Sequence, residues 1–181
     1  MRWEMLFEDL EAELAAEFAR EKTAEIREMV RVERARQTLR ELLAPQLKAQ
    51  IEVRLLGGER LHGCLGALGL DWVMLLRGET EELIPMNAIG AWIQRGAGER
   101  DGGSGGRAKF TQALRALVRD RARVTVGGSD GALLASGTLD QAGQDLVAIA
   151  LHPRDEFRRE PSVRGYALVP ISSIAWVRKE T

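Results

Sequence analysis

The segment GCLGALGLDWV at residues 63–73 is repeated as GTLDQAGQDLV at residues 137–147. Both copies fit the pattern Gly-x-Leu-x-x-x-Gly-x-Asp-x-Val. A second pattern, Leu-x-Pro-x-x-x-Ile, begins at Leu83 and again at Leu168. Self-similarity of this kind is typical of a duplicated structural unit. We therefore expect the chain to contain two copies of one small fold.

Within the first copy, apolar and polar residues alternate or form short apolar runs between glycine-rich or proline-containing turns. Such spacing predicts short strands in a small barrel rather than a βαβ unit. We expect strands at residues 51–55, 61–68, 72–77, 82–84 and 89–94, and a short helix before each copy, at residues 39–48 and 110–120. The predicted fold class is α+β, mainly β: an N-terminal helical arm followed by two five-stranded barrels, each preceded by a short helix.

The expected domain boundaries follow from these patterns. Residues 1–36 form the helical arm, 37–95 the first barrel with its leading helix, and 108–181 the second. Residues 96–107 hold six glycines, which is typical of a flexible linker. The second copy also carries an inserted hairpin at 152–164. Trp92 and Trp176 follow the second pattern, and we expect them at equivalent positions, packing the barrels or the contact between them.

The N-terminal arm has an apolar stripe suited to a partner. Its members recur every three or four residues, so they share one helix face; they are Trp3, Phe7, Leu10, Leu14 and Phe18. Residues 1–28 hold nine acidic and four basic side chains, whereas 29–48 hold two and five. An antiparallel arrangement would bring unlike charges together. Either one long helix binds a partner or a second copy, or the arm breaks near residues 22–23 into a hairpin. A third interpretation is a solvated helix whose stripe covers its own core.

Residues 71–76 (DWVMLL) and 87–89 (NAI) carry a resemblance to a known family. Together with the bent strands and leading helix, they resemble the Sm-like barrels, a family that includes the bacterial RNA chaperone Hfq and the C-terminal barrel of RimP-type ribosome-maturation factors. The resemblance covers about two thirds of the chain. It implies the small-barrel fold, and it implies RNA as a ligand class.

The residues depart from the Sm-like pattern where that family contacts nucleotides. The family has an Asn shortly after the turn aspartate, but Met74 and Leu75 stand in that region, and Ala148 and Ile149 in the second copy. Its later Arg-Gly pair is replaced by residues 85–87 (PMN) and 170–172 (PIS). We therefore expect the fold without the nucleotide pocket, and we interpret Asp71 and Asp145 as turn-capping residues.

The inserted hairpin is the candidate nucleic-acid site. Its arginines could hold phosphates while its aromatic ring stacks a base; these residues are Arg154, Phe157, Arg158, Arg159 and Arg164. The alternative is a solvated loop whose arginines pair with the neighbouring acids.

Composition and charge narrow the function classes. The net charge of −1 excludes a generally basic nucleic-acid coat. Cys64, the single cysteine, forms no intramolecular disulfide, which favours the cytoplasm. We expect no membrane span, no metal site and no cofactor, and we do not expect an enzyme, because His62 and His152 belong to different copies and no nucleophile motif is present. The sequence thus favours a non-catalytic interaction or scaffold protein acting through its helical arm, with an RNA-binding or ribosome-associated regulator as the alternative.

Overall fold

The computed structural model describes residues 2–94, 105–152 and 163–180. It divides into two compact units, Met1–Leu39 and Arg40–Thr181, and each is treated by itself. The chain is mainly β, with ten antiparallel strands in one sheet and a long N-terminal helix. This confirms the coarse fold class predicted from the sequence.

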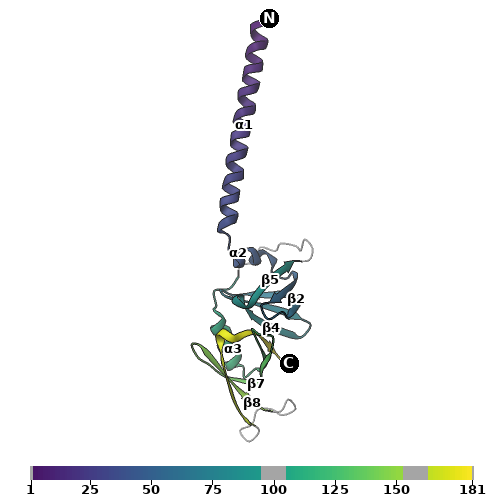
Figure 1. Ribbon diagram of the computed structural model, residues 1–181, viewed down its shortest axis with the longest axis vertical. Coiled ribbons are helices and arrows are strands. Elements are labelled where there is room, and N and C mark those ends of the chain that lie inside the picture. Colours follow the sequence, from purple (N-terminus) through teal and green to yellow (C-terminus); the bar gives the residue numbers. More distant parts are fainter. Residues whose placement is uncertain (1, 95–104, 153–162, 181) are drawn as a thin grey trace. The chain divides into compact units, whose positions relative to one another are not determined.

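The first unit is one uninterrupted helix, α1 (Arg2–Arg36), of 35 residues (Figure 1). The predicted alternative of a hairpin broken near residues 22–23 is wrong, because Thr23 Oγ1 donates to Ala19 O at 2.7 Å within a continuous helix. Glu, Ala, Leu and Arg dominate the segment and it contains no Gly or Pro, so nothing in it opposes a helix. At 1.5 Å per residue α1 is about 52 Å long.

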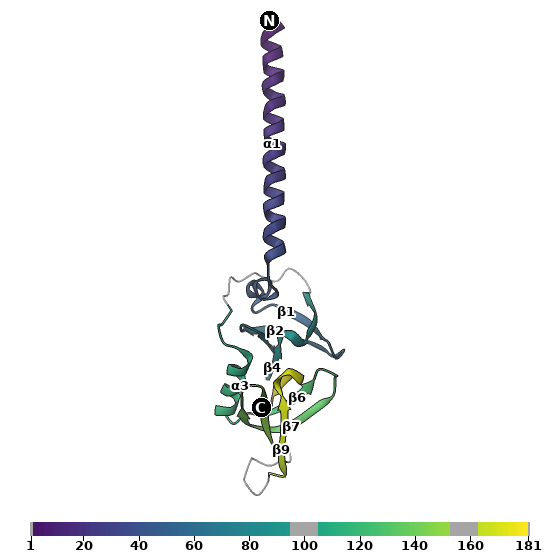
Figure 2. The same cartoon turned by 60° about the vertical axis from the view of Figure 1, so that its left-hand side comes forward.

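The second unit contains the sheet and the short helices. Its strands are β1 (Gln50–Leu55), β2 (Arg60–Leu68), β3 (Trp72–Arg77), β4 (Thr80–Pro85), β5 (Ile89–Gln94), β6 (Arg123–Gly128), β7 (Leu133–Ala142), β8 (Leu146–Leu151), β9 (Gly165–Pro170) and β10 (Ile174–Lys179). The helices are α2 (Leu39–Leu43), which begins at the unit boundary, α3 (Phe110–Arg119), and the single-turn 3-10 helices η1 (Ala44–Gln46), η2 (Met86–Ala88) and η4 (Ile171–Ser173). The predicted strands and leading helices are present within a few residues of their expected bounds. Helix α3 lies against β7 (Figure 2).

The sheet has the order β5-β1-β2-β3-β4-β10-β6-β7-β8-β9 and is not closed. The strand pairing therefore does not give the two separate closed barrels that the repeat predicts. The order within β5 to β4 is the same as that within β10 to β9, so each half keeps one pattern. The two halves join because β4 pairs with β10, which makes one continuous sheet.

Turn geometry recurs between the halves along with the sequence. The amide of Met86 donates to Asp71 O at 2.8 Å, and the amide of Ile171 donates to Asp145 O at 2.7 Å. Glycine residues at 58 and 131 both have positive φ, at 87° and 81°, in the turns after β1 and β6. The repeated residues thus build the same two turns in each half.

The second unit contains two apolar cores. We call the pairing of β4 with β10 the seam, and these two strands contribute side chains to both cores. Successive strand residues point to opposite faces of a sheet. Leu83 and Val177 therefore pack into the core formed by β6–β10 and α3, whereas Ile84 and Trp176 pack into the core formed by β1–β5. Each half contributes side chains to the core of the other.

The seam also holds a buried carboxylate. Glu82 is 1% exposed and faces Arg178, whose Nη2 lies 2.6 Å from Glu82 Oε1. The Arg178 guanidinium lies 4.5 Å from the ring centroid of Trp176. The ring of Trp176 in turn donates its Nε1 hydrogen to Glu59 on the first half. A buried charge is tolerated when it is paired and hydrogen-bonded, as Glu82 is here.

The two tryptophans of the final strands do not occupy equivalent positions. Trp92 faces Val53 in the β1–β5 ladder, and the corresponding partner of Val126 in the second half is Val177, one residue beyond Trp176. Trp92 and Trp176 therefore differ by one position and serve different contacts. Trp92 lies against the first core and donates to Gln46 Oε1 at 3.0 Å, while Trp176 crosses the seam.

Candidate interaction surfaces

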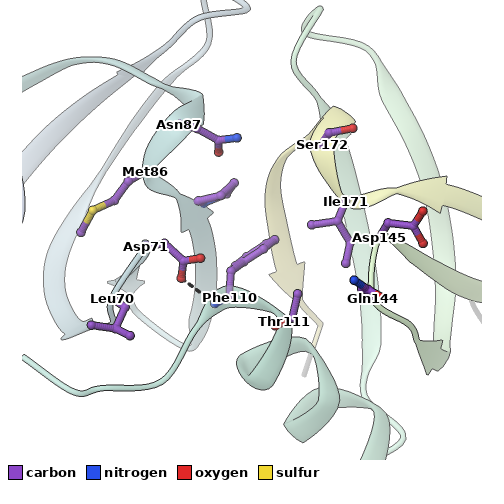
Figure 3. Close-up of a pocket in the computed structure, with 11 residues that line it drawn as sticks. Leu70, Asp71, Met86, Asn87, Phe110, Thr111, Gln144, Asp145, Ile171 and Ser172 are labelled. Carbon is purple, nitrogen blue, oxygen red and sulfur yellow. Dashed lines mark hydrogen bonds between the residues drawn. The ribbon is translucent and has the colours of Figure 1, made fainter.

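A pocket of about 630 Å³ lies in the second unit where the repeated turns of the two halves meet the start of α3 (Figure 3). One wall comes from the β2–β3 turn and η2, and the opposite wall from the equivalent β7–β8 turn and η4. Its lining residues are Leu70, Asp71, Pro85, Met86, Asn87, Phe110, Thr111, Gln144, Asp145, Ile171 and Ser172. We call this the turn pocket. The repeated Asp therefore appears on both walls.

The carboxylate of Asp71 caps helix α3. Its Oδ1 accepts from the amide of Phe110 at 2.7 Å, and Phe110 is the first residue of α3. The preceding residue, Lys109, has no side-chain acceptor, so the free amides at the helix start need an acceptor from elsewhere. The sequence predicts a turn-capping role for Asp71, whereas the side-chain bond in the structure joins the first half to α3.

Asp145 occupies the equivalent turn without an equivalent cap. Its backbone oxygen accepts from Ile171, as in the first half. Its side chain is exposed and, within the part of the chain that the structure describes, forms no hydrogen bond or ion pair. The turn pocket thus has one carboxylate engaged by a helix and one open to a ligand.

The charged side chains that line the turn pocket are all negative. Its lining includes two carboxylates and no lysine or arginine. The other polar lining side chains are Asn87, Thr111, Gln144 and Ser172, each of which carries an acceptor oxygen. The apolar lining residues are Leu70, Pro85, Met86, Phe110 and Ile171. This chemistry disfavours a phosphate and favours a cation.

The positions where Sm-like proteins contact a base are turned inward. Leu75 and Ile149 are fully buried, Ala148 is 6% exposed, and Met74 packs against the second core. None of them lines the turn pocket. The departure from the family pattern that the sequence indicates is therefore matched by burial of these side chains.

Most residues of the predicted nucleic-acid hairpin lie outside the described residues. These are Arg154, Phe157, Arg158 and Arg159. Arg164 is described: it is exposed, and its amide donates to Leu151 O at 2.8 Å just before β9. The structure therefore brings no set of hairpin arginines together, and the site stays a prediction. Of the expected linker, Gly105 and Gly106 are described, and their carbonyls accept from Arg40 Nη2 at 3.2 and 3.1 Å.

The predicted partner face of α1 is described in part. Leu14 is 47% exposed and Phe18 is 69% exposed. Trp3, Phe7 and Leu10 lie in α1, and their side chains are outside the described set. Further exposed apolar side chains continue along the helix; they are Ile26, Met29, Val30 and Val32. The apolar stripe predicted from the sequence ends at Phe18, and the exposed apolar side chains of α1 continue beyond it as far as Val32.

The two histidines of the chain lie in different halves of the sheet. His62 is exposed and faces Glu52 across the β1–β2 ladder, while His152 Nε2 lies 2.8 Å from Thr138 Oγ1 in the other half. Among the described residues, no group of three or more His, Cys, Asp or Glu side chains could hold a metal ion. In the same portion of the chain, no helix has both the length and the apolar character to cross a bilayer.

Comparisons with protein-family models, with curated proteins and with solved structures found no match to this chain. The resemblance to Sm-like barrels therefore rests on the residues quoted above, together with the strand order repeated in the two halves.

Proposed function

We propose that this protein is a non-catalytic scaffold that associates with a second copy of itself through α1, and that the two halves of its sheet are Sm-like modules displayed by this assembly. The observation that carries the proposal is the apolar stripe of a 35-residue helix. Its described members remain exposed within the chain, although isolated helices gain most of their stability from packing an apolar face.

Part of the exposed apolar set of α1 falls in one narrow sector, and Ile26 and Val30 lie beside that sector, about 60° and 100° beyond Met29. At 100° per residue, Leu14, Phe18 and Met29 lie within a sector of about 60°, and Val32 returns to the direction of Leu14. The spacing from Phe7 to Phe18 to Met29 is 11 residues in each step, which is close to the natural period of a straight helix. Such a stripe stays on one side of a helix without strong supercoiling.

Charge selects the direction of pairing. The N-terminal part of α1 is acidic and the C-terminal part is basic, with Arg31, Arg34 and Arg36 near its end. Parallel helices would place like charges side by side, whereas antiparallel helices place the acidic part of one beside the basic part of the other. A second copy of α1 supplies both the apolar face and the complementary charge.

The test is the mass of the full chain in solution. Wild-type protein should have twice the chain mass of 20.0 kDa, and the double variant Leu14→Glu with Phe18→Glu should have the single mass while keeping its sheet signal in circular dichroism. Ala16→Glu with Ala24→Glu is the matched control, because it adds the same charge on the side of α1 away from the stripe and should remain dimeric. A monomeric wild type, or a dimer that survives the stripe variant, would refute the proposal.

The RNA-binding alternative remains a prediction from the hairpin sequence. If the hairpin binds RNA, Arg158→Ala with Arg159→Ala should weaken binding and reduce its dependence on salt concentration. Filter-binding titrations at several salt concentrations measure both quantities. Unchanged affinity and salt slope would remove the hairpin as the site.

A further inference from the structure

We propose that the turn pocket binds an arginine side chain presented by a peptide segment of a protein partner. The inference goes beyond self-association, since every lining residue lies in the second unit and none belongs to α1.

The size and shape of the turn pocket suit a side chain rather than a flat surface contact. Its volume of about 630 Å³ lies within the roughly 300–1,000 Å³ of ligand pockets. Figure 3 shows Met86 and Ile171 on opposite walls, with Phe110 between them at the start of α3. Apolar walls of this kind accept the aliphatic stem of a long side chain, while its charged end meets the polar groups.

The charge of the lining selects a cation. Asp145 is exposed and, among the described residues, its carboxylate forms no hydrogen bond or ion pair, so both of its oxygens can accept from a ligand. Asp71 uses Oδ1 for the amide of Phe110, and its Oδ2 adds a second negative group at the opposite wall. With no lysine or arginine in the lining, nothing within the pocket neutralises this pair.

The number and placement of acceptors favour a guanidinium over an ammonium. A guanidinium offers five donors in a fixed plane and pairs with a carboxylate through two parallel hydrogen bonds. The side-chain oxygens of Asn87, Gln144 and Ser172 also line the pocket and are further acceptors for the remaining donors. A planar cation paired with Asp145 can therefore use acceptors beyond that carboxylate.

To test the proposal, the full-length chain is titrated with the peptide Gly-Ala-Arg-Ala-Gly, and the chemical shifts of its backbone amides are measured by NMR. The amides of Met86, Asn87 and Gln144 should shift and saturate. The same peptide with citrulline, which keeps the shape and loses the charge, should leave them in place. Asp145→Asn should weaken binding about 1.5-fold to fivefold, as expected for losing one exposed ion pair. Asp120→Asn, at the far end of α3, removes the same charge outside the pocket and should bind as wild type.

A second variant tests the pocket independently of whether Asp145→Asn keeps its fold. Ser172→Asp adds a carboxylate to the exposed rim and should tighten binding of the arginine peptide. Equal binding of the citrulline peptide, equal weakening by Asp120→Asn, or no effect of either pocket variant would overturn the proposal. Binding should persist in the Leu14→Glu and Phe18→Glu double variant, so failure of self-association through α1 and failure of arginine binding are separate outcomes.

Discussion

Exchange of side chains across the seam predicts that the two halves of the sheet unfold together. Leu83 belongs to β4 of the first half but is packed in the second core, where it is 7% exposed. Trp176 belongs to β10 of the second half but is packed in the first core, where it is 6% exposed. Each substitution to alanine should therefore damage the core of the opposite half.

The magnitudes follow from the size of the buried groups. Removing a buried leucine costs about 2–5 kcal/mol and a buried tryptophan about 3–5 kcal/mol in the free energy of unfolding. These are large fractions of the roughly 5–15 kcal/mol that stabilises a typical domain. Leu68→Ala is the matched control for Leu83→Ala, since Leu68 is 3% exposed and packs only in the core of its own half.

Urea denaturation followed by circular dichroism measures the free energy, and amide hydrogen exchange locates the damage. Leu83→Ala should reduce the protection of Val126 and Ile149 in the second half, where Leu83 packs, more than Leu68→Ala does. Both variants should still unfold in one transition. Two separate unfolding transitions would refute the shared cores and support two independent barrels. Loss of amide protection only in the first half, to which Leu83 belongs, would do the same.

Two further predictions concern the cap of α3 and the ring of Trp176. Asp71→Ala removes the acceptor for the amide of Phe110 and should cost about 1 kcal/mol in the free energy of unfolding; thermal melts compared with Asp120→Ala test it, and equal melting temperatures would contradict it. Gly127→Ala should destabilise the chain clearly, because an added Cβ would clash with the indole of Trp176. Gly127→Ala combined with Trp176→Phe should recover part of that loss in urea denaturation, and no recovery would contradict the stated cause.

The sequence repeat predicted the strands well because their physics is local. Alternation at residues 51–55, the glycine turns and the Pro85 step each fix a strand or a turn through neighbouring residues. The pairing of β4 with β10 was not predictable in the same way. In β4 the neighbouring acidic residues Glu81 and Glu82 give no sign of a strand paired on both sides, because Glu82 is buried by facing Arg178 of β10.

The turn pocket illustrates why a site can escape sequence reasoning even when its residues are noticed. Asp71 and Asp145 stood out as repeated turn residues, and that interpretation treated each copy alone. Their meeting in one pocket depends on the seam and on α3, which are contacts between residues far apart in sequence. A repeated motif therefore predicted the two walls, and only the strand pairing placed them opposite each other.

Helix α3 links the pocket to the seam. Its first amide is held by Asp71 of the first half, while its buried face, including Leu114 and Leu117, packs in the second core together with Leu83. A ligand that competes for the Asp71 carboxylate would weaken the cap of α3, whereas one held mainly by Asp145 would leave the cap in place. Because the side chain of Asp145 forms no hydrogen bond or ion pair among the described residues, binding through its carboxylate costs no existing contact. The asymmetry between two repeated aspartates thus separates support of the fold from binding of a partner.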